Sequence, residues 1–339
     1  MTNETAAAKP VVPPQLQVLD IALGYFRSRA LTVAAELEVA DHLAAGPLHV
    51  DELAKRTQSH APTLFRLLRA LESIGVFAQV SPRVFANTPA SETLRKNIPG
   101  SIRTILLATS TPSHGQFEAW TGLLGSVKTG TVAFDRIYGH DFWEFLRGNP
   151  AEAELFNDSM AAGRSRTAVA VAAAYDWSQF PVIADIGGGI GGQLVEILKA
   201  HPACRGILFD LPEGLQGAAA HERIEVVSGN FFERVPSGAD AYILRTVVHD
   251  WPDERAAAIL KSVRKAMKPG ACAILIEMVV PETSEPALSI WLDLLMLVVS
   301  GGKERTATEF RKLLGDSGFE LERIVPTPSG HGLIIGRPI

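Results

Sequence analysis

The chain has 339 residues, a length that indicates about two domains. Apolar residues make up 47% of it and charged residues 20%, which predicts packed cores and excludes collagen-like and disordered classes. Its 32 basic and 37 acidic side chains give a net charge of −5, which disfavours a protein that coats a nucleic-acid backbone. Cys204 and Cys272 are too few for a disulfide scaffold or a structural zinc site, and we expect both to be reduced and buried.

Two segments bear on the cellular location. Residues 1–14 contain prolines but lack the hydrophobic core of a signal peptide, so we expect a flexible N-terminus. The stretch Leu288–Val299 is the most apolar in the chain, but it contains Asp293 and is too short to span a bilayer. These features predict a cytoplasmic protein with no membrane partner.

The first hundred residues are predicted to be mainly helical. Apolar residues recur at helical spacing over residues 15–45, where Gly46 and Pro47 end the run. Two shorter helices and two short strands are expected next, over residues 50–54, 62–74, 76–80 and 83–86. Two short helices followed by a hairpin are typical of a winged helix, so we expect residues 15–100 to form a winged-helix dimerisation domain.

A winged helix also raises a second function class, a ligand-sensing regulator that binds DNA. The helix over residues 62–74 would then read a groove through Arg66 and Arg69. However, residues 1–100 hold ten basic and nine acidic side chains, and the rest of this helix is largely apolar. A groove-reading helix needs a polar, basic outer face. We therefore favour packing or dimerisation, with the two arginines on a solvated or ion-paired face and no nucleic-acid partner.

Residues 101–178 are predicted to be a helical linker that contributes to a substrate pocket. Phe156 and Met160 lie four apart and share a helix face, and Trp291 and Leu295 have the same spacing in the later apolar helix. Such side chains suit the wall of an apolar pocket, although ordinary core packing explains them equally well. The candidate pocket residues are Phe142, Trp143, Phe156, Met160, Trp291, Leu295 and Met296.

From residue 179 onward, short β-rich runs alternate with helices. The strands are expected over residues 182–186, 206–209, 224–227, 241–244 and 273–278, with helices that include 192–200 and 254–267. A terminal strand pair is expected over residues 319–325 and 332–336. This alternation predicts an α/β domain, residues 179–339, built on a doubly wound, mostly parallel Rossmann-like sheet.

A glycine-rich loop joins the first of these strands to its helix. Between Asp185 and Gly192 it has five glycines, which permit a tight turn and let a ligand approach bare backbone. Asp210 ends the second strand, at the distance expected for a carboxylate that binds ribose hydroxyls. A nicotinamide-dependent oxidoreductase fits this pattern too. Asp185 favours S-adenosylmethionine, because a carboxylate repels a pyrophosphate but attracts a sulfonium and an α-ammonium group.

A histidine follows the fourth strand, at the edge where a doubly wound sheet binds its ligands. His249 stands there, and an imidazole can act as a general base near neutral pH. Glu277 at the end of the fifth strand and Glu304 in a polar loop are carboxylates that can orient the ring. The alternatives are a capping or exposed histidine, and a Glu304 that pairs with Lys303 or Arg305.

Three motifs together resemble one known family. They are Asp185–Gly189, His249-Asp250-Trp251, and residues 301–306 with the sequence Gly-Gly-Lys-Glu-Arg-Thr. In this order they resemble the small-molecule O-methyltransferases of the caffeate and hydroxyindole type, whose bacterial relatives tailor polyketides and phenazines. The resemblance spans nearly the whole chain. It implies that His249 removes the proton of the substrate hydroxyl and that Glu277 and Glu304 orient its imidazole.

The resemblance also implies a homodimer and a set of ligand contacts. The implied cofactor contacts are Asp185, Gly187, Gly189, Asp210, Leu211, Asn230, Phe231 and Arg245, and Asp250 joins the substrate contacts. The chain departs from the family at Asn230, where many members have an aspartate near the adenine, and at Arg245, where plant members often have lysine. An amide still bonds an adenine amino group and the positive charge is kept, so we expect altered affinity rather than a lost site.

The sequence therefore predicts transfer of a methyl group from S-adenosylmethionine to a hydroxyl, expected to be phenolic, of an aromatic small molecule. The product of the cofactor is S-adenosylhomocysteine, and we expect no metal. The sulfonium is already a good leaving group, so the protein mainly aligns oxygen, methyl carbon and sulfur. Some relatives with this fold no longer methylate, but His249 argues against that here.

Overall fold

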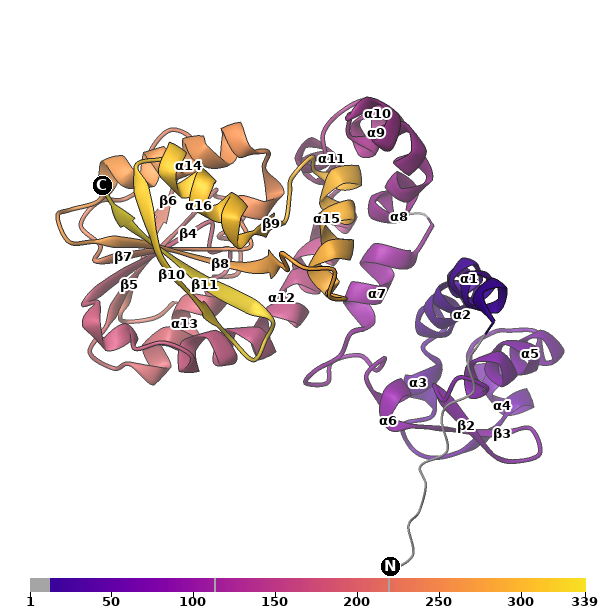
Figure 1. The fold of residues 1–339 in the computed structure, drawn as a ribbon. Helices are drawn as coiled ribbons and strands as arrows, with labels where there is room; N and C mark the ends of the chain where they lie inside the picture. The colour runs from indigo at the N-terminus through magenta and orange to yellow at the C-terminus, as the bar shows by residue number, and fades with distance from the viewer. Residues whose placement is uncertain (1–12, 113, 219) are drawn as a thin grey trace, which may run out of the picture. The chain divides into compact units, whose positions relative to one another are not determined.

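The structure is a computed structural model that describes residues 13–112, 114–218 and 220–339, apart from the side chains of residues 161–166. The predicted flexible N-terminus, residues 1–14, therefore lies almost wholly outside the described residues. The chain divides into two compact units, Met1–Thr111 and Pro112–Ile339 (Figure 1). The finer division that we predicted, with boundaries at residues 100 and 178, stays a prediction.

The N-terminal unit combines helices with a small sheet, as the winged-helix pattern predicts. Its helices are α1 (Pro14–Ala22), α2 (Gly24–Glu36), α3 (Val39–His42), α4 (Val50–Arg56), α5 (Ala61–Glu72), α6 (Pro89–Glu92) and α7 (Arg103–Ser110). Its strands pair antiparallel in the order β1 (Leu48–His49), β3 (Val84–Asn87) and β2 (Phe77–Ser81). Leu53, Leu68 and Phe85 are fully buried in its core.

Residues 15–45 are mainly helical, as predicted, but the structure divides them into three helices, a division that the prediction did not include. Leu23 separates α1 from α2. Glu38 separates α2 from α3, and its φ of 54° is left-handed and cannot continue a helix. Periodicity misses these breaks because the apolar spacing continues across them.

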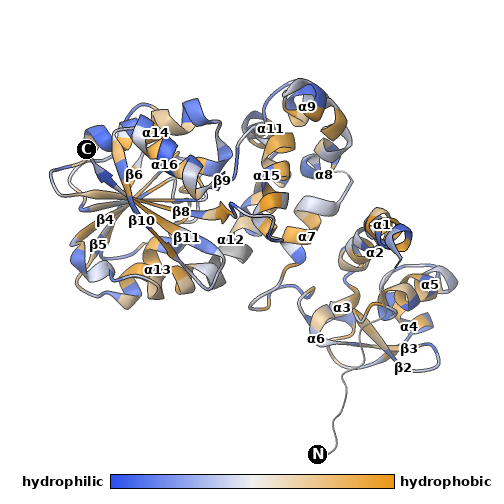
Figure 2. Cartoon of the chain, viewed as in Figure 1, coloured by the Kyte–Doolittle hydropathy of each residue, from blue (hydrophilic) through white to orange (hydrophobic). Residues whose placement is uncertain are grey.

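Two surfaces of this unit bear on the predictions. Arg66 and Arg69 of α5 are exposed, as expected for a solvated face. The helices α1 and α2 also expose large apolar side chains, namely Leu16, Val18, Leu19, Ile21, Tyr25 and Phe26, on elements that Figure 2 colours partly as hydrophobic. Several large apolar side chains exposed on two consecutive helices are typical of an interaction surface, and we call this set the exposed apolar patch of α1 and α2.

The C-terminal unit is built on a mostly parallel sheet of the predicted Rossmann-like class (Figure 1). Its parallel strands run in the order β8 (Cys272–Val280), β7 (Ala241–Arg245), β4 (Val182–Ile186), β5 (Arg205–Asp210) and β6 (Ile224–Ser228). The strand β11 (His331–Pro338) pairs antiparallel with both β8 and β10 (Phe319–Pro326). The short β9 (Arg305–Thr306) pairs with the end of β8. The predicted strands are thus all present.

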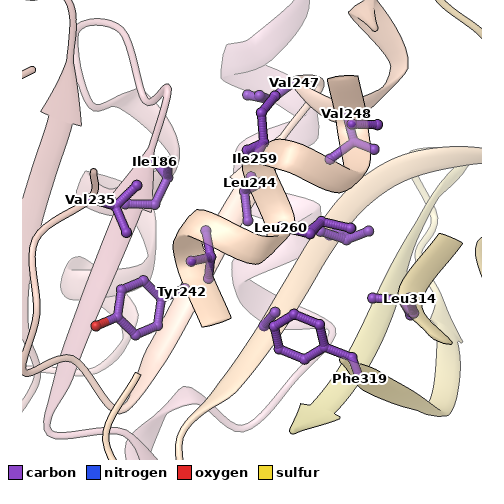
Figure 3. Close-up of a cluster of buried hydrophobic side chains, with 14 of the residues drawn as sticks. Ile186, Val235, Tyr242, Leu244, Val247, Val248, Ile259, Leu260, Leu314 and Phe319 are labelled. Atoms are coloured by element: carbon purple, nitrogen blue, oxygen red, sulfur yellow. The ribbon is translucent and has the colours of Figure 1, made fainter. Parts of the chain in front are cut away.

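Helices cover both faces of this sheet. The helices α14 (Asp253–Ala266) and α16 (Ala307–Asp316) pack on one face, and α12 (Pro150–Ala173) and α13 (Gly192–Ala200) pack on the other (Figure 1). Strand residues alternate between the two cores. In β7, Tyr242 and Leu244 face the first core (Figure 3), and Ala241 and Ile243 face the second. Burial on both faces explains why the parallel strands are continuous apolar runs in the sequence.

A further group of helices packs around α15 (Leu288–Val299), which lies between β8 and β9 in the chain. They are α8 (Gly115–Ala119), η1 (Trp120–Gly122), α9 (Leu123–Thr129), α10 (Ala133–Tyr138) and α11 (Phe142–Gly148). The short η2 (Trp177–Gln179) leads into β4. Among the residues that the structure describes, no helix has the length and apolar character needed to cross a membrane. Cys204 and Cys272 are free and buried, which confirms the prediction for both.

Candidate active site

The glycine loop after β4 has a shape that only glycine permits. Gly187, Gly189 and Gly191 have φ values of 70°, 57° and 83°, in the left-handed region that other residues avoid. A Cβ on Gly187 would lie 2.8 Å from Cγ2 of Val247. A Cβ on Gly188 would lie 2.5 Å from a methyl carbon of Leu208. The loop therefore presents bare backbone at the carboxyl edge of the central strand, which is where this fold binds its ligand.

Two acidic side chains flank this loop. Asp185 ends β4 and is almost fully buried. Asp210 ends β5, and its carboxylate accepts the backbone N–H groups of Gly189 and Leu211, each at 2.7 Å. These bonds fix the Asp210 carboxylate beside the loop, where it can accept hydrogen bonds from ribose hydroxyls. Two carboxylates here repel a pyrophosphate and suit a ligand that carries positive charge, so the residues fit S-adenosylmethionine.

Residues at the ends of the neighbouring strands complete this side of the crevice. Asn230 follows β6, and its Oδ1 accepts the backbone N–H of Phe232 at 3.0 Å. The ring of Phe231 would lie 3.6 Å from a Cβ on Gly187, so it reaches the glycine loop. Leu211 is 45% exposed beside Asp210. The cofactor residues predicted from β4, β5 and β6 thus gather at one edge of the sheet.

Arg245 ends β7 on the face of the sheet that α12 covers. Its side chain is 5% exposed, and its guanidinium donates a hydrogen bond to Thr167 of α12. Thr167 was not predicted, because nothing in its local sequence marks it. His331 of β11 was also missed. Burial and the charge of Arg245 lower the pKa of His331 to about 4, so this ring is neutral at physiological pH.

His249 and Glu304 form a close pair. His249 lies in the short helix η3 (Val248–Asp250) after β7, and its side chain is 17% exposed. Its Nδ1 lies 2.7 Å from Oε1 of Glu304, a carboxylate that is 1% exposed. The carboxylate accepts, so Nδ1 carries the proton and Nε2 of the neutral ring keeps its lone pair. This arrangement removes the alternative in which Glu304 pairs with Lys303 or Arg305, because neither makes an ion pair with it among the described residues.

Glu277 holds backbone rather than the imidazole. Its Oε1 accepts the N–H groups of Val247, Val248 and His249 at 3.1, 2.9 and 3.4 Å. These donors converge because Thr246 adopts a left-handed φ of 49° and turns the chain at the end of β7. Among the described residues Glu277 makes no hydrogen bond to the ring itself; this fully buried carboxylate bonds the loop that carries the ring, and its predicted part in orienting the imidazole stays a prediction.

The carboxylates around His249 govern its protonation. Burial opposes a charged ring, but the negative charges of Asp250 and Glu277 and the hydrogen bond that Nδ1 donates to Glu304 outweigh burial and raise the pKa of His249 to about 10. Burial raises the pKa of Glu277 to about 7, against the opposing effect of His249. Oδ1 of Asp250 lies 3.5 Å from Nε2 of His249. This acid therefore lies beside the ring nitrogen that Glu304 does not bind and that can face a substrate hydroxyl.

One group of described residues has the side-chain types that could bind a metal ion. It consists of His249, Glu277 and Glu304. One ligand atom from each lies within 4.8 Å of the others. However, Oε1 of Glu277 accepts three N–H groups and Oε1 of Glu304 bonds the imidazole. Hydrogen bonds therefore account for the arrangement of these three side chains.

Aromatic side chains from α11 and α12 lie next to the His249 loop. The ring centroids of Phe142 and Phe156 are 5.3 Å apart, and those of Trp143 and Phe156 are 6.0 Å apart. Trp143 stacks on Trp251 at 6.2 Å, two residues after His249. Leu295 of α15 packs on the same cluster.

The other predicted pocket residues are less clearly placed. Met160 and Met296 are half-buried. Trp291 is 64% exposed and does not belong to the aromatic cluster, although it lies on the same helix as Leu295. Leu295 thus packs on the aromatic cluster and Trp291 does not, and the assignment of both residues to the acceptor pocket stays a prediction.

Comparisons with known proteins agree with this geometry. An O-methyltransferase domain matches residues 120–320, and an O-methyltransferase dimerisation domain matches residues 19–97. The phenazine O-methyltransferase of Lysobacter antibioticus is 40% identical over 99% of both chains. The crystal structure of LaPhzM superposes with a TM-score of 0.91 at 40% identity, over 97% of this chain and 100% of that chain.

A third relative was solved with its ligands. The O-methyltransferase NcsB1 from neocarzinostatin biosynthesis, in complex with S-adenosylmethionine and 2-hydroxy-5-methyl naphthoic acid, has a TM-score of 0.78 at 32% identity, over 92% of this chain and 96% of that chain. These matches support neither the nicotinamide-dependent oxidoreductase nor the DNA-binding regulator. The chain belongs to the S-adenosylmethionine-dependent O-methyltransferases that carry a dimerisation domain and methylate small-molecule hydroxyls in secondary metabolism.

Proposed function

We propose that the acceptor is a phenolic hydroxyl of an aromatic small molecule and that His249 is the general base. The observation that carries the proposal is the 2.7 Å contact between Nδ1 of His249 and Oε1 of Glu304. This contact directs Nε2 of the ring away from Glu304, toward Asp250. A lone histidine at a sheet edge has no need of a buried carboxylate partner, whereas a base that accepts a proton does.

Different residues of this chain are proposed to bind the cofactor, to take the proton and to hold the His249 loop. When bound, S-adenosylmethionine supplies a methyl group on a sulfonium, which needs no activation as a leaving group. Asp210 is proposed to hold its ribose and Arg245 its carboxylate, while Asp185 complements its positive charge. His249 takes the hydroxyl proton at Nε2, and Glu304 stabilises the imidazolium that forms. Glu277 keeps the loop in place through three backbone N–H groups.

The aromatic cluster supports an aromatic acceptor. Trp143 stacks on Trp251 of the His249 loop, and Phe156 packs against both Trp143 and Phe142. The cluster is thereby joined to this loop. Aromatic rings prefer such edge and stacked partners, which a planar phenol also offers. Two relatives act on or bind phenazine and naphthoic acid compounds, as their names state, and this likeness supports the same class here.

The proposal includes three further features. Methyl transfer is proposed to need no metal, because the sulfonium is already a good leaving group and His249 supplies the base. The apolar side chains exposed on α1 and α2 are covered in a homodimer, which the matched dimerisation domain supports. The protein acts in the cytoplasm, as we expected from the sequence.

A substrate screen tests the proposal. The purified protein is incubated with methyl-labelled S-adenosylmethionine and a panel of phenols, hydroxyquinones and hydroxyphenazines, and labelled product is identified by mass spectrometry. Aliphatic alcohols and aromatic amines of similar size are the matched controls. We expect label on an aromatic hydroxyl. Methylation of the amines or aliphatic alcohols alone would overturn the acceptor class, and full activity of a His249→Ala variant would overturn the base.

A further inference from the structure

The two members of the proposed dyad come from loops, not from the regular sheet. His249 lies in η3 after β7, and Glu304 lies between α15 and β9. The residues are 55 positions apart in the chain. Their 2.7 Å contact therefore depends on whatever fixes one loop against the other.

The two loops touch directly through their backbones. The backbone N–H of Lys303 donates to the carbonyl oxygen of His249 at 2.7 Å. A Cβ on Gly302 would lie 2.0 Å from the same oxygen, so only glycine allows this approach. One hydrogen bond fixes the distance between the loops, but it leaves their relative angle free.

Arg305 supplies the missing constraint. Its side chain is fully buried, and its Nη1 donates to the carbonyl oxygens of Val248 at 3.1 Å and Lys303 at 3.0 Å. Its Nη2 donates to the carbonyl oxygen of Trp251 at 2.9 Å. One rigid guanidinium thus holds the backbone on both sides of His249, at Val248 and Trp251, and also holds the residue before Glu304. Such a planar fork fixes angles as well as distances.

The charge of Arg305 is balanced by an acid of the next helix. Nε and Nη2 lie 2.9 and 2.8 Å from Oδ1 of Asp253, the first residue of α14. A buried guanidinium without a partner would be strongly unfavourable, so this ion pair lets the side chain stay inside. A lysine at this position keeps the charge, but it has three donors on a flexible stem and cannot reproduce the fork.

Asp293 holds Glu304 from the other side. It lies in the apolar helix α15, where a half-buried acid is unfavourable, and burial raises the pKa of its carboxyl group. Its Oδ1 accepts the backbone N–H of Glu304 at 3.0 Å. The helix α15 thereby fixes the backbone from which the Glu304 side chain reaches His249.

We propose that Arg305 and Asp293 are positioning residues for the methyl-transfer base. Arg305 sets the angle between the two loops, Asp293 sets the backbone of Glu304, and together they hold Nε2 of His249 toward the acceptor. This inference rests on the proposed function of His249. Neither side chain is expected to touch cofactor or acceptor, so their loss lowers kcat and alters the pH profile while the KM for S-adenosylmethionine stays nearly unchanged.

The test compares Arg305→Lys, Arg305→Met, Asp293→Asn and Asp293→Leu with the full-length wild type. Arg264→Lys is the matched control, because Arg264, in the last turn of α14, also binds two backbone carbonyl oxygens, and these belong to Gly318 and Ile339 rather than to the His249 or Glu304 loop. We expect Arg305→Lys to lower kcat about 10–100-fold, the size of effect that a small misplacement produces. Asp293→Asn retains an acceptor oxygen and should rescue most of the activity that Asp293→Leu loses. Thermal unfolding of every variant is measured in parallel.

Two readouts separate positioning from a merely structural role. The first is the double variant Arg305→Lys with Glu304→Gln. Its fold-decrease in kcat should be smaller than the product of the decreases in the two single variants, because both residues act on one dyad. The second is titration of the His249 ring by NMR with labelled histidine, the signal being assigned by its absence in His249→Gln. This titration needs no turnover, and Arg305→Lys should move the apparent pKa of the ring downward.

The outcomes have distinct meanings. An Arg305→Lys variant with wild-type kcat, pH profile and ring titration would overturn the inference. So would losses that multiply fully in the double variant, or a lowered unfolding temperature with an unchanged pH profile. If the wild type methylates no acceptor, the proposed function fails, while the ring titration still decides whether Arg305 positions His249.

Discussion

Oε1 of Glu304 accepts a hydrogen bond from Nδ1 of His249 across 2.7 Å, although the two residues belong to separate loops. The pairing determines which ring nitrogen can accept a proton from the substrate. Because Glu304 occupies Nδ1, the neutral ring carries its lone pair on Nε2, and Asp250 lies 3.5 Å from that atom. This contact accounts for the orientation and the tautomer of the proposed base, and it adds to the effect of Asp250 and Glu277 on the pKa of the ring.

Replacing His249 by alanine should remove turnover and leave cofactor binding intact. The variant lacks the group that takes the proton, so kcat should fall by about 10²–10⁴-fold, the usual contribution of a general base. Calorimetry with S-adenosylhomocysteine should give a Kd close to that of the wild type, since the substitution leaves the proposed cofactor residues in place, including Arg245 at the end of β7. His221→Ala, in the turn before β6, is the control. Loss of S-adenosylhomocysteine binding would show instead that His249 supports the cofactor site.

Replacing Glu304 by glutamine should change the pH dependence of the reaction. Carboxylates raise the pKa of His249 from 6.5 to about 10, and the base must be neutral to act. The wild-type kcat/KM should therefore rise with pH above neutrality. In Glu304→Gln the rising limb should move to lower pH, while the plateau falls roughly 10²-fold because the ring is no longer oriented. An unchanged limb would mean that Glu304 does not set the protonation of the base.

The same pKa shift has a consequence for stability. A raised pKa in the folded chain means that the protonated ring stabilises the fold below about pH 6.5, and that this contribution is lost as the pH rises through about 10. Chemical denaturation between these values should show a falling free energy of unfolding for the wild type. The fall should be smaller in Glu304→Gln.

Replacing Asp210 by asparagine should weaken cofactor binding without unfolding the protein. The carboxylate accepts the N–H groups of Gly189 and Leu211, and an amide presents one acceptor oxygen instead of two. Lost charge-assisted bonds should raise the Kd for S-adenosylhomocysteine about 10–100-fold. Calorimetry measures this change, with the exposed Asp316→Asn as control. An unaltered Kd would show that Asp210 does not bind the ribose.

Removal of divalent metal should leave the activity unchanged. Oε1 of Glu277 and Oε1 of Glu304 already accept hydrogen bonds, and the proposed proton transfer to His249 uses no metal. Enzyme treated with EDTA and then desalted should retain its full rate, as measured with labelled S-adenosylmethionine. A loss of activity that Mg²⁺ or Zn²⁺ restores would contradict the metal-free proposal and assign the His249, Glu277 and Glu304 cluster to a metal.

Charges in the exposed apolar patch of α1 and α2 should break the homodimer. Ile21 and Phe26 are 70% and 61% exposed, so replacing both by aspartate costs little in the isolated unit but introduces unpaired charge into an interface. Sedimentation should show a dimer for the wild type and a monomer for this double variant. Val80→Asp, at a residue of β2 that is 56% exposed, is the control. A dimer that persists in the double variant would place the interface elsewhere.

Local patterns in the sequence predicted most of the fold. The parallel strands are continuous apolar runs because they are buried on both faces, and the glycine loop stands out because its left-handed turns exclude side chains. The breaks around Leu23 and Glu38 were missed, because helical spacing does not report backbone angles. Asp293 could have been recognised as functional, since an acid in an apolar helix calls for a partner.

The sequence by itself determined the family, the strands of the Rossmann-like sheet and the glycine loop, because each depends on residue type and on position along the chain. Only the tertiary structure decided which carboxylate binds the ring and which binds the backbone. Glu277 and Glu304 are the same residue type, and their roles differ because Thr246 turns the chain toward one and Lys303 and Arg305 fix the other loop. Contacts between segments this far apart depend on packing, which no local pattern encodes.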